Sequence, residues 1–203
     1  MTKKNNRQKL YLSLNIKLPM TTTYKLIVIG NSNTGKSSLI NRYINDEFST
    51  NIHSTIGIEF THKDMDDHTK LSIWDSAGQE RFQSVGSALY NNADVVMFVY
   101  DVTNIESFHG LEHWYRQYIT YGQKDAIKII VGNKIDLNAT VSDEMAKSWA
   151  VQRNMMFETA SAKSSAGVHR AFATVISQLN KLPRVQKEKI ELKLKPKSDR
   201  CCY

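Results

Sequence analysis

Residues 24–40 read YKLIVIGNSNTGKSSLI, and this stretch sets the expected fold. Its first part is a short apolar run rich in β-branched residues, which is typical of a buried parallel strand. A turn that contains glycine follows, and SSLINRYI (37–44) then has the apolar spacing of a helix. The stretch therefore predicts a strand, a turn and a helix in succession.

The rest of the chain repeats this alternation of strand and helix. GIEFTHKDM (57–65) and TKLSIWD (69–75) flank a polar turn and predict a β-hairpin. Three more apolar runs predict strands, and three stretches between or after them predict helices: strands at 93–101, 126–133 and 155–161, and helices at 105–121, 142–153 and 165–181. We expect a doubly wound α/β fold, with a mostly parallel six-stranded sheet, helices on both faces and one antiparallel edge hairpin. Ligands of such sheets bind beyond the carboxyl ends of the strands.

Length and composition predict one soluble domain. The chain has 203 residues, 41% hydrophobic and 23% charged, and no apolar run long enough to span a membrane. We assign residues 23–182 to the domain, 1–22 to a disordered basic N-terminal arm and 183–203 to a flexible basic tail. The N-terminal residues lack the continuous apolar segment of a secretory signal, so we expect a cytoplasmic protein.

The net charge of +7 lies at the two ends of the chain. Residues 1–23 hold five basic side chains and no acid, and residues 184–203 hold seven basic and three acidic side chains, which leaves residues 24–183 at −2. The domain therefore offers no basic face of the kind that grips nucleic acid. The basic ends are either solvated tails or contacts for an anionic membrane.

The turn after the first strand has the pattern of a phosphate-binding loop. Gly30 to Ser37 satisfies G-x-x-x-x-G-K-[ST]. Backbone N–H groups of such a loop surround phosphate oxygens, Lys36 would neutralise the terminal phosphates, and the hydroxyl of Ser37 would bind Mg²⁺. The alternative is an ordinary turn between a strand and a helix.

Three later loops fall where the carboxyl edge of the sheet is expected. Residues 75–79 (DSAGQ) supply an acid for the metal's water shell, a glycine N–H for the terminal phosphate and a glutamine that can orient water. Residues 133–136 (NKID) place Asp136 where it can accept two N–H donors from guanine. Residues 161–163 (SAK) offer the Ala162 N–H to guanine O6, and the stems of Lys134 and Lys163 could sandwich the base. NKID alone also occurs in solvated loops, so the order and spacing carry the prediction.

These motifs resemble those of the Ras superfamily of small GTPases, and within it the Rab proteins. The resemblance covers residues 23–182, and the stretches 56–60, 70–82 and 100–108 are typical of Rabs. It implies the small G domain of the P-loop NTPases, with GTP or GDP and Mg²⁺ as ligands. The implied nucleotide-binding residues are Asn33, Thr34, Gly35, Lys36, Ser37, Ser38, Phe48, Thr55, Gly78, Asn133, Lys134, Asp136, Ser161, Ala162 and Lys163. The implied metal ligands are Ser37, Thr55 and Asp75, and the implied catalytic residues are Gln79, Lys36 and Thr55.

The resemblance also implies a molecular switch that serves vesicle traffic. The γ-phosphate would order residues 48–60 and 76–92, and hydrolysis would release them. Hydrolysis should be slow until a partner supplies an arginine. The implied partners are a nucleotide exchange factor, a GTPase-activating protein, a GDP-dissociation inhibitor, a prenylation escort protein and effectors, with no nucleic acid and a monomeric chain. Phe60, Trp74 and Tyr90 match the family's aromatic trio, whose packing effectors read, while Ser76 and residues 87–94 depart from the family pattern.

Cys201 and Cys202 are the chain's two cysteines, and they stand almost at its end. Adjacent cysteines cannot staple a fold, so no disulfide framework is expected. By the resemblance they accept two geranylgeranyl groups, and two lipids with a basic tether give stable peripheral attachment to membranes. The LKL motif at 192–194 would be gripped by the escort protein. Tyr203 departs from the usual Rab ending, and unmodified thiols are the alternative.

Two other functions are compatible with parts of the sequence. His109 to His113 spells H-x-x-E-H, an inverted zinc-protease signature, although no third ligand has convincing spacing. The chain could also bind GTP without turnover, because Ser32 places a side chain near the γ-phosphate where many relatives have glycine. Gln79 argues against that second function.

Overall fold

The computed structural model describes residues 21–50, 55–78 and 89–181, which form one six-stranded sheet in the order β2-β3-β1-β4-β5-β6. β2 and β3 are antiparallel, and the other neighbouring strands are parallel. The predicted sheet with its antiparallel edge hairpin is confirmed. The strands are β1 (Thr22–Ile29), β2 (Ile58–Asp66), β3 (Thr69–Ser76), β4 (Val95–Asp101), β5 (Ile127–Asn133) and β6 (Met156–Thr159).

The central strands are apolar because both of their faces are covered. Every residue of β4 is buried, and so are the last four residues of β1. β2 lies at the edge, and its residues are only half-buried or exposed. A strand that is apolar on both faces is stable only between two layers of helix, and the sequence pattern therefore predicted the layers as well as the strands.

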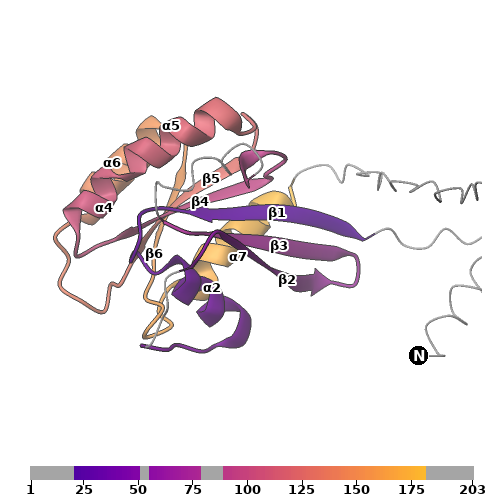
Figure 1. Ribbon diagram of the computed structural model, residues 1–203, viewed down its shortest axis with the longest axis horizontal. Coiled ribbons are helices and arrows are strands. Elements are labelled where there is room, and N and C mark those ends of the chain that lie inside the picture. Colours follow the sequence, from indigo (N-terminus) through magenta and orange to yellow (C-terminus); the bar gives the residue numbers. More distant parts are fainter. Residues whose placement is uncertain (1–20, 51–54, 79–88, 182–203) are drawn as a thin grey trace, which may run out of the picture.

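Helices cover both faces of the sheet, as predicted (Figure 1). α2 (Lys36–Asn45) and α7 (Val168–Leu179) pack on one face, and α4 (Ile105–His109), α5 (Leu111–Tyr121) and α6 (Asp143–Gln152) pack on the other. Each face has its own hydrophobic core. The buried stripe of α7 shows the helical period, with Val168, Ala171, Phe172, Val175 and Leu179 turned inward.

Two predicted helices differ in their bounds. The stretch 105–121 was predicted as one helix, but it is interrupted at Gly110 between α4 and α5. The His113 N–H bonds the Gly110 carbonyl at 3.1 Å, a three-residue spacing that tightens the junction. The stretch 165–181 becomes helical only at Val168, because Ser165 and Gly167 take the left-handed φ values of 68° and 71°.

The division of the chain into an arm, a domain and a tail stays a prediction. β1 begins at Thr22, one residue before the predicted start at 23. Most of the predicted arm (1–22) and the whole predicted tail (183–203) lie outside the described residues.

Candidate functional site

A cavity of about 500 Å³ opens at the carboxyl edge of the sheet, where the sequence predicted the ligand site. Its lining brings together segments that follow β1, β3, β5 and β6. Most predicted nucleotide-binding residues line it: Asn33, Gly35, Lys36, Ser37, Ser38, Phe48, Thr55, Gly78, Asn133, Lys134, Asp136, Ala162 and Lys163. Thr34 and Ser161 are fully buried behind this lining. Five further lining residues were not predicted as ligands: Ser32, Ser49, Thr50, Ser76 and Leu137.

One end of the cavity, where the sequence predicts phosphate binding, is formed by the loop between β1 and α2, and we call it the phosphate end. α2 begins at Lys36 without a side-chain cap, and its N-terminus lies at the cavity. Gly35 has φ 84°, and a Cβ at this position would lie 2.4 Å from the Asn133 side-chain nitrogen, so only glycine fits here without displacement. A helix N-terminus with free backbone donors favours a bound anion.

Lys36 places a cation inside this end of the cavity. Its side chain is buried, and Nζ donates to the carbonyls of Gly30 and Asn31, both at 2.9 Å. Burial lowers the pKa of Lys36 to about 8, and the nearby carboxylate of Asp75 offsets part of that effect. A buried ammonium with an unfavourable solvation balance favours a negatively charged ligand beside it.

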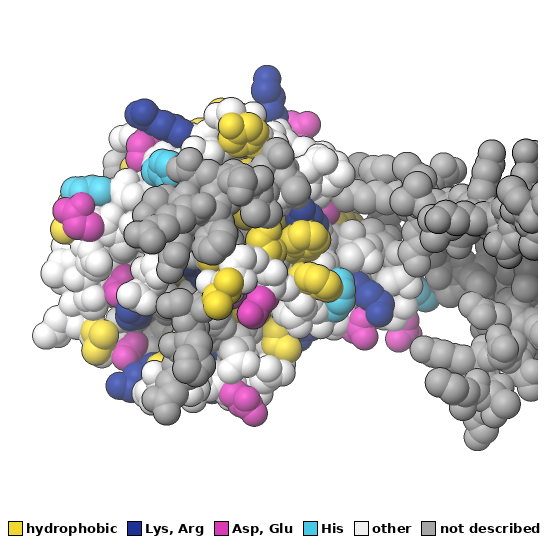
Figure 2. All heavy atoms as spheres, in the orientation of Figure 1, with side chains coloured by type: hydrophobic (Ala, Val, Ile, Leu, Met, Phe, Trp, Pro, Cys, Tyr) yellow, Lys and Arg dark blue, Asp and Glu magenta, His cyan; other side chains and the backbone are white. Residues whose placement is uncertain are grey.

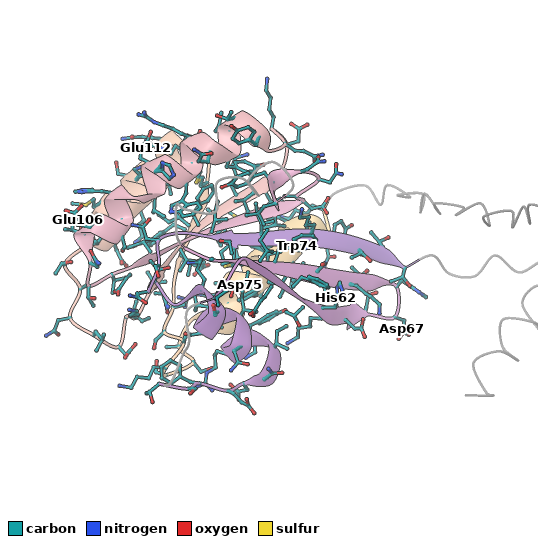
Figure 3. All side chains as sticks on the ribbon, viewed as in Figure 1. His62, Asp67, Trp74, Asp75, Glu106 and Glu112 are labelled. Carbon is teal, nitrogen blue, oxygen red and sulfur yellow. The ribbon has the colours of Figure 1, made fainter. Side chains whose placement is uncertain are left out.

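The predicted metal ligands lie together at the same end. Ser37 Oγ donates to Asp75 Oδ2 at 2.5 Å and lies 2.8 Å from Thr55 Oγ1, which is 3.4 Å from Asp75 Oδ2. Figure 3 shows Asp75 between the end of β3 and the start of α2. Burial raises the pKa of Asp75, and the hydrogen bonds from Ser37 and Thr55 and the charge of Lys36 act against it.

This cluster fits a hard divalent cation. Asp75 Oδ1 is buried and has no hydrogen-bond partner among the described residues. An orphaned carboxylate oxygen beside two hydroxyl groups is the oxygen-rich donor set that Mg²⁺ prefers, directly or through its waters.

The other end of the cavity is held together by Asn133. Its Nδ2 donates to the Thr34 carbonyl at 2.8 Å, and its Oδ1 accepts from the Ala162 N–H at 3.2 Å. Because Asn133 is buried, one side chain fixes the phosphate loop and the 161–163 loop relative to each other. The amide is therefore a structural link as well as part of the lining.

Asp136 and Lys134 are each oriented by a neighbour. Ser161 Oγ donates to Asp136 Oδ1 at 2.6 Å, which leaves the carboxylate on the cavity lining. Lys134 Nζ forms an ion pair with Asp101 Oδ2 at 2.6 Å. Burial alone would raise the pKa of Asp101, but its bonds with Lys134 and Thr103 hold it below the ordinary value. The ion pair anchors the head of Lys134, so its stem lies along the lining.

Sequence reasoning missed three supporting residues. Asp101 ends β4 at the same sheet edge, so the rule that strand ends carry the site could have found it. Arg42 lies on α2, and its Nε donates to the Ala162 carbonyl at 2.9 Å. Trp114 lies on α5, and its Nε1 donates to Asn31 Oδ1 at 2.8 Å. No local pattern marks these last two, because each bond joins positions far apart in the chain.

Gln79, Cys201 and Cys202 lie outside the described residues. Phe60 is exposed, and its ring lies 5.9 Å from that of Trp74. Trp74 is labelled in Figure 3, and the space-filling view in Figure 2 shows hydrophobic side chains exposed on this face of the molecule. Tyr90 is only 3% exposed and packs against Tyr118 and Tyr121 of α5. The side chain of Tyr90 is therefore not open to a partner on this surface.

The zinc hypothesis gains no support. Within the described ranges, no group of three or more His, Cys, Asp or Glu side chains could hold a metal. Glu112 lies on α5 (Figure 3) and forms ion pairs with Arg116 at 3.0 Å and Arg153 at 2.7 Å.

None of the helices in the described part of the chain is long and apolar enough to cross a bilayer.

Comparison with known proteins places the chain in a family. The model of the Ras family matches residues 25–181. The Ras-related protein Rab-1 of Theileria parva is 44% identical over 162 residues, which cover 77% of this chain and 74% of the relative. The Ras-related protein Rab-8B of Homo sapiens is 40% identical over 78% of this chain and 81% of its own length. The Ras-related protein RABG3b of Arabidopsis thaliana is 38% identical over 76% of this chain and 82% of its own length. The family match includes all the described helices, the segments that line the cavity and all of the sheet except the first residues of β1. With the identity to these relatives, it shows that the chain belongs to the Rab small GTPases of the Ras family.

Proposed function

We propose that this Rab protein binds GTP and GDP together with Mg²⁺ at the cavity, and that hydrolysis of GTP switches the surface that it presents to partners. The observation that carries the proposal is the charge arrangement at one end of the cavity. A buried cation, a helix N-terminus and a hydroxyl–carboxylate cluster converge there. This combination complements a magnesium-bound polyphosphate.

Different residues of the cavity would bind the phosphates, the metal ion and the base. Lys36 and the backbone N–H groups of residues 33–38 bind the phosphates, while Ser37, Thr55 and Asp75 would hold Mg²⁺. When bound, Mg²⁺ supplies positive charge that offsets the phosphate charge. Phe48, Lys134, Asp136, Ser161, Ala162 and Lys163 surround the base, and the Asp136 carboxylate selects guanine by accepting its two N–H donors.

The switch is built on Thr55 and Gly78. Both residues line the cavity. We propose that each contacts the terminal phosphate and that these contacts hold the adjoining parts of the chain in place. Loss of that phosphate removes the contact and releases residues 48–60 and 76–92. We propose Gln79 as the residue that orients the attacking water, with Lys36 and Thr55 assisting.

Turnover in the isolated protein should be slow, about 10⁻⁴ to 10⁻³ per second, with a rise of up to about 10⁵-fold when a partner supplies an arginine. A single-turnover phosphate-release assay tests this rate. Gln79→Leu should retain GTP affinity and lose most hydrolysis. A wild-type protein that binds GTP but releases no phosphate would instead indicate that the chain signals by nucleotide occupancy alone. The side chain of Ser32 on the cavity lining would then offer a steric reason for the lack of hydrolysis.

Binding itself has an independent test. The full-length protein, purified gently in Mg²⁺, should carry guanine nucleotide, which chromatography of the denatured supernatant identifies. Adenine nucleotides should not compete. A folded preparation without guanine nucleotide and without affinity for it would overturn the proposed function.

The partners and the location follow from the family and are proposals for this chain. We infer that it works with an exchange factor, a GTPase-activating protein, a GDP-dissociation inhibitor, a prenylation escort protein and effectors. We also infer a monomer that acts on the cytosolic face of intracellular membranes, with a cytosolic pool. Geranylgeranyl groups on Cys201 and Cys202 would provide the anchor. Intact mass of the membrane-bound protein should show two isoprenoid additions, and a bare tail in that fraction would refute the anchor.

A further inference from the structure

Asn31 is a phosphate-loop residue whose side chain is engaged away from the cavity lining. Its neighbours Ser32 and Asn33 line the cavity, but Asn31 does not. Its Oδ1 accepts a hydrogen bond from Trp114 Nε1 at 2.8 Å. The bond is partly buried and joins the phosphate loop to α5, a helix on one face of the sheet.

The main chain of Asn31 organises the rest of the loop. Its carbonyl accepts from Thr34 Oγ1 at 2.9 Å and from Lys36 Nζ, also at 2.9 Å. The position of this one peptide therefore sets the turn of the loop and the place of the buried ammonium. A contact that fixes the Asn31 side chain therefore also helps to fix the loop and the Lys36 ammonium.

The space around Asn31 is closed on two further sides. A Cβ at Gly110 would lie 2.5 Å from both Nδ2 and Oδ1 of Asn31. A Cβ at Gly78 would lie 2.3 Å from the Ser32 nitrogen and 2.5 Å from the Asn31 carbonyl carbon. Gly110 is also the point at which the helical stretch is interrupted. The missing side chain there provides the slot into which the Asn31 amide fits.

We propose that Trp114 is a positioning residue for nucleotide binding: its indole N–H holds Asn31, and Asn31 in turn places the carbonyl that binds Lys36. This inference rests on the proposed function, because it concerns the same cavity. It connects the buried face of α5 to the phosphate end, so that a change at α5 alters how long nucleotide stays bound. A purely structural tryptophan would contribute to stability without this effect.

The variants separate the hydrogen bond from the bulk of the ring. Trp114→Phe keeps an aromatic ring in the core and removes the donor, while Asn31→Ala removes the acceptor. Trp149→Phe is the matched control, because Trp149 is a tryptophan of the same layer that packs against Phe108 and Tyr115. The double variant Trp114→Phe/Asn31→Ala tests whether the two side chains act as one unit.

The first measurement is the dissociation rate of a fluorescent GDP from the full-length protein in Mg²⁺. Trp114→Phe and Asn31→Ala should each speed release by about three- to tenfold, the effect of one lost buried hydrogen bond, and the double variant should release no faster than the singles. Trp149→Phe should match the wild type. Unchanged release from Trp114→Phe, or multiplied effects in the double variant, would overturn the proposal.

The second measurement does not depend on turnover. In the wild-type protein loaded with GDP, the indole N–H resonance of Trp114 should be protected from exchange with solvent, and Asn31→Ala should shift it and remove the protection. An indole resonance whose position and exchange protection are the same in the wild type and in Asn31→Ala would also overturn the proposal. If Trp114→Phe does not fold, Asn31→Ala still decides the matter through both readouts. A wild-type protein that fails to bind GDP would sink the proposed function instead, so the two failures are distinguishable.

Discussion

Replacement of Lys36 by methionine is expected to stabilise the nucleotide-free protein at neutral pH while it abolishes nucleotide binding. Methionine keeps an unbranched apolar chain of similar length and removes the charge. Among the described residues, Asp75 is the one anion that offsets the burial of the Lys36 ammonium, and burial also disfavours the charge of Asp75 itself. The side chain that binding requires is thus a source of instability in the protein without ligand.

The size of the effect follows from the pKa of Lys36. The pKa falls from 10.5 to about 8, so the charged form loses about 3 kcal/mol on folding at neutral pH. The variant also lacks the hydrogen bonds that Lys36 donates to the carbonyls of Gly30 and Asn31, each of which contributes about 0.5–1.5 kcal/mol. The free energy of unfolding should therefore rise by about 1 kcal/mol in the variant at pH 7.

The pH dependence gives the sharper signature. Between about pH 8 and 10.5 the unfolded chain still holds the Lys36 proton while the folded protein has lost it. The unfolded state then binds more protons, so the free energy of unfolding of the wild type rises with pH across this window. Lys36→Met lacks this rise. The wild type should overtake the variant and end about 2 kcal/mol more stable near pH 10.5.

Urea unfolding of nucleotide-free protein in EDTA, at several pH values, measures this crossing. Buried tyrosines such as Tyr90 and Tyr118, whose pKa values burial raises to about 12, lower the stability of both proteins at high pH and cancel in the difference. Lys147→Met, at an exposed lysine of α6, is the control and should show no crossing. A constant difference between wild type and Lys36→Met across the window would refute the reasoning.

Two further substitutions test the links at the other end of the cavity. Asn133→Ala leaves a phosphate-loop carbonyl and the Ala162 N–H without their buried partner, so the free energy of unfolding should fall by about 2–4 kcal/mol. The control Asn138→Ala, at an exposed position, should lower it by no more than about 0.5 kcal/mol. Equal losses for the two variants in urea titrations would contradict this expectation. Arg42→Met removes the bond from its Nε to the Ala162 carbonyl, and release of fluorescent GDP should quicken about tenfold. The exposed Arg116→Met should leave release unchanged, and a rate for Arg42→Met equal to that of the control would show that the arginine does not support the base-binding loop.

Much of the fold was predictable because the strands carry strong local signals. β4 is apolar up to its last residue, and β5 is largely apolar. The hairpin of β2 and β3 turns at Asp67–His68, inside the polar turn that the sequence indicated. The helix bounds were less predictable. A glycine inside a helical pattern weakens the helix without fixing where it ends, so Gly110 did not by itself mark the interruption between α4 and α5.

The site was predictable to the extent that it follows the strand ends. Each loop motif lies directly after a strand, so topology alone gathered them around one cavity. The supporting bonds were not predictable, because they join residues whose proximity only the packed helices determine. Trp114 and Asn31 are 83 positions apart, and Arg42 and Ala162 are 120 apart. The role of Gln79 stays a prediction, since it lies outside the described residues.

The two ends of the cavity differ in how their polar groups are satisfied. At the base end, Asn133, Ser161 and Arg42 are bonded to neighbouring loops, so the pocket is held in shape by the protein itself. At the phosphate end, Lys36 is buried at an energetic cost and Asp75 Oδ1 has no partner among the described residues. A ligand's anionic end and its metal would relieve that cost, whereas the base would find a preformed pocket. We therefore expect the difference in binding free energy between GTP and GDP to arise mainly at the phosphate end, beside Lys36 and Asp75.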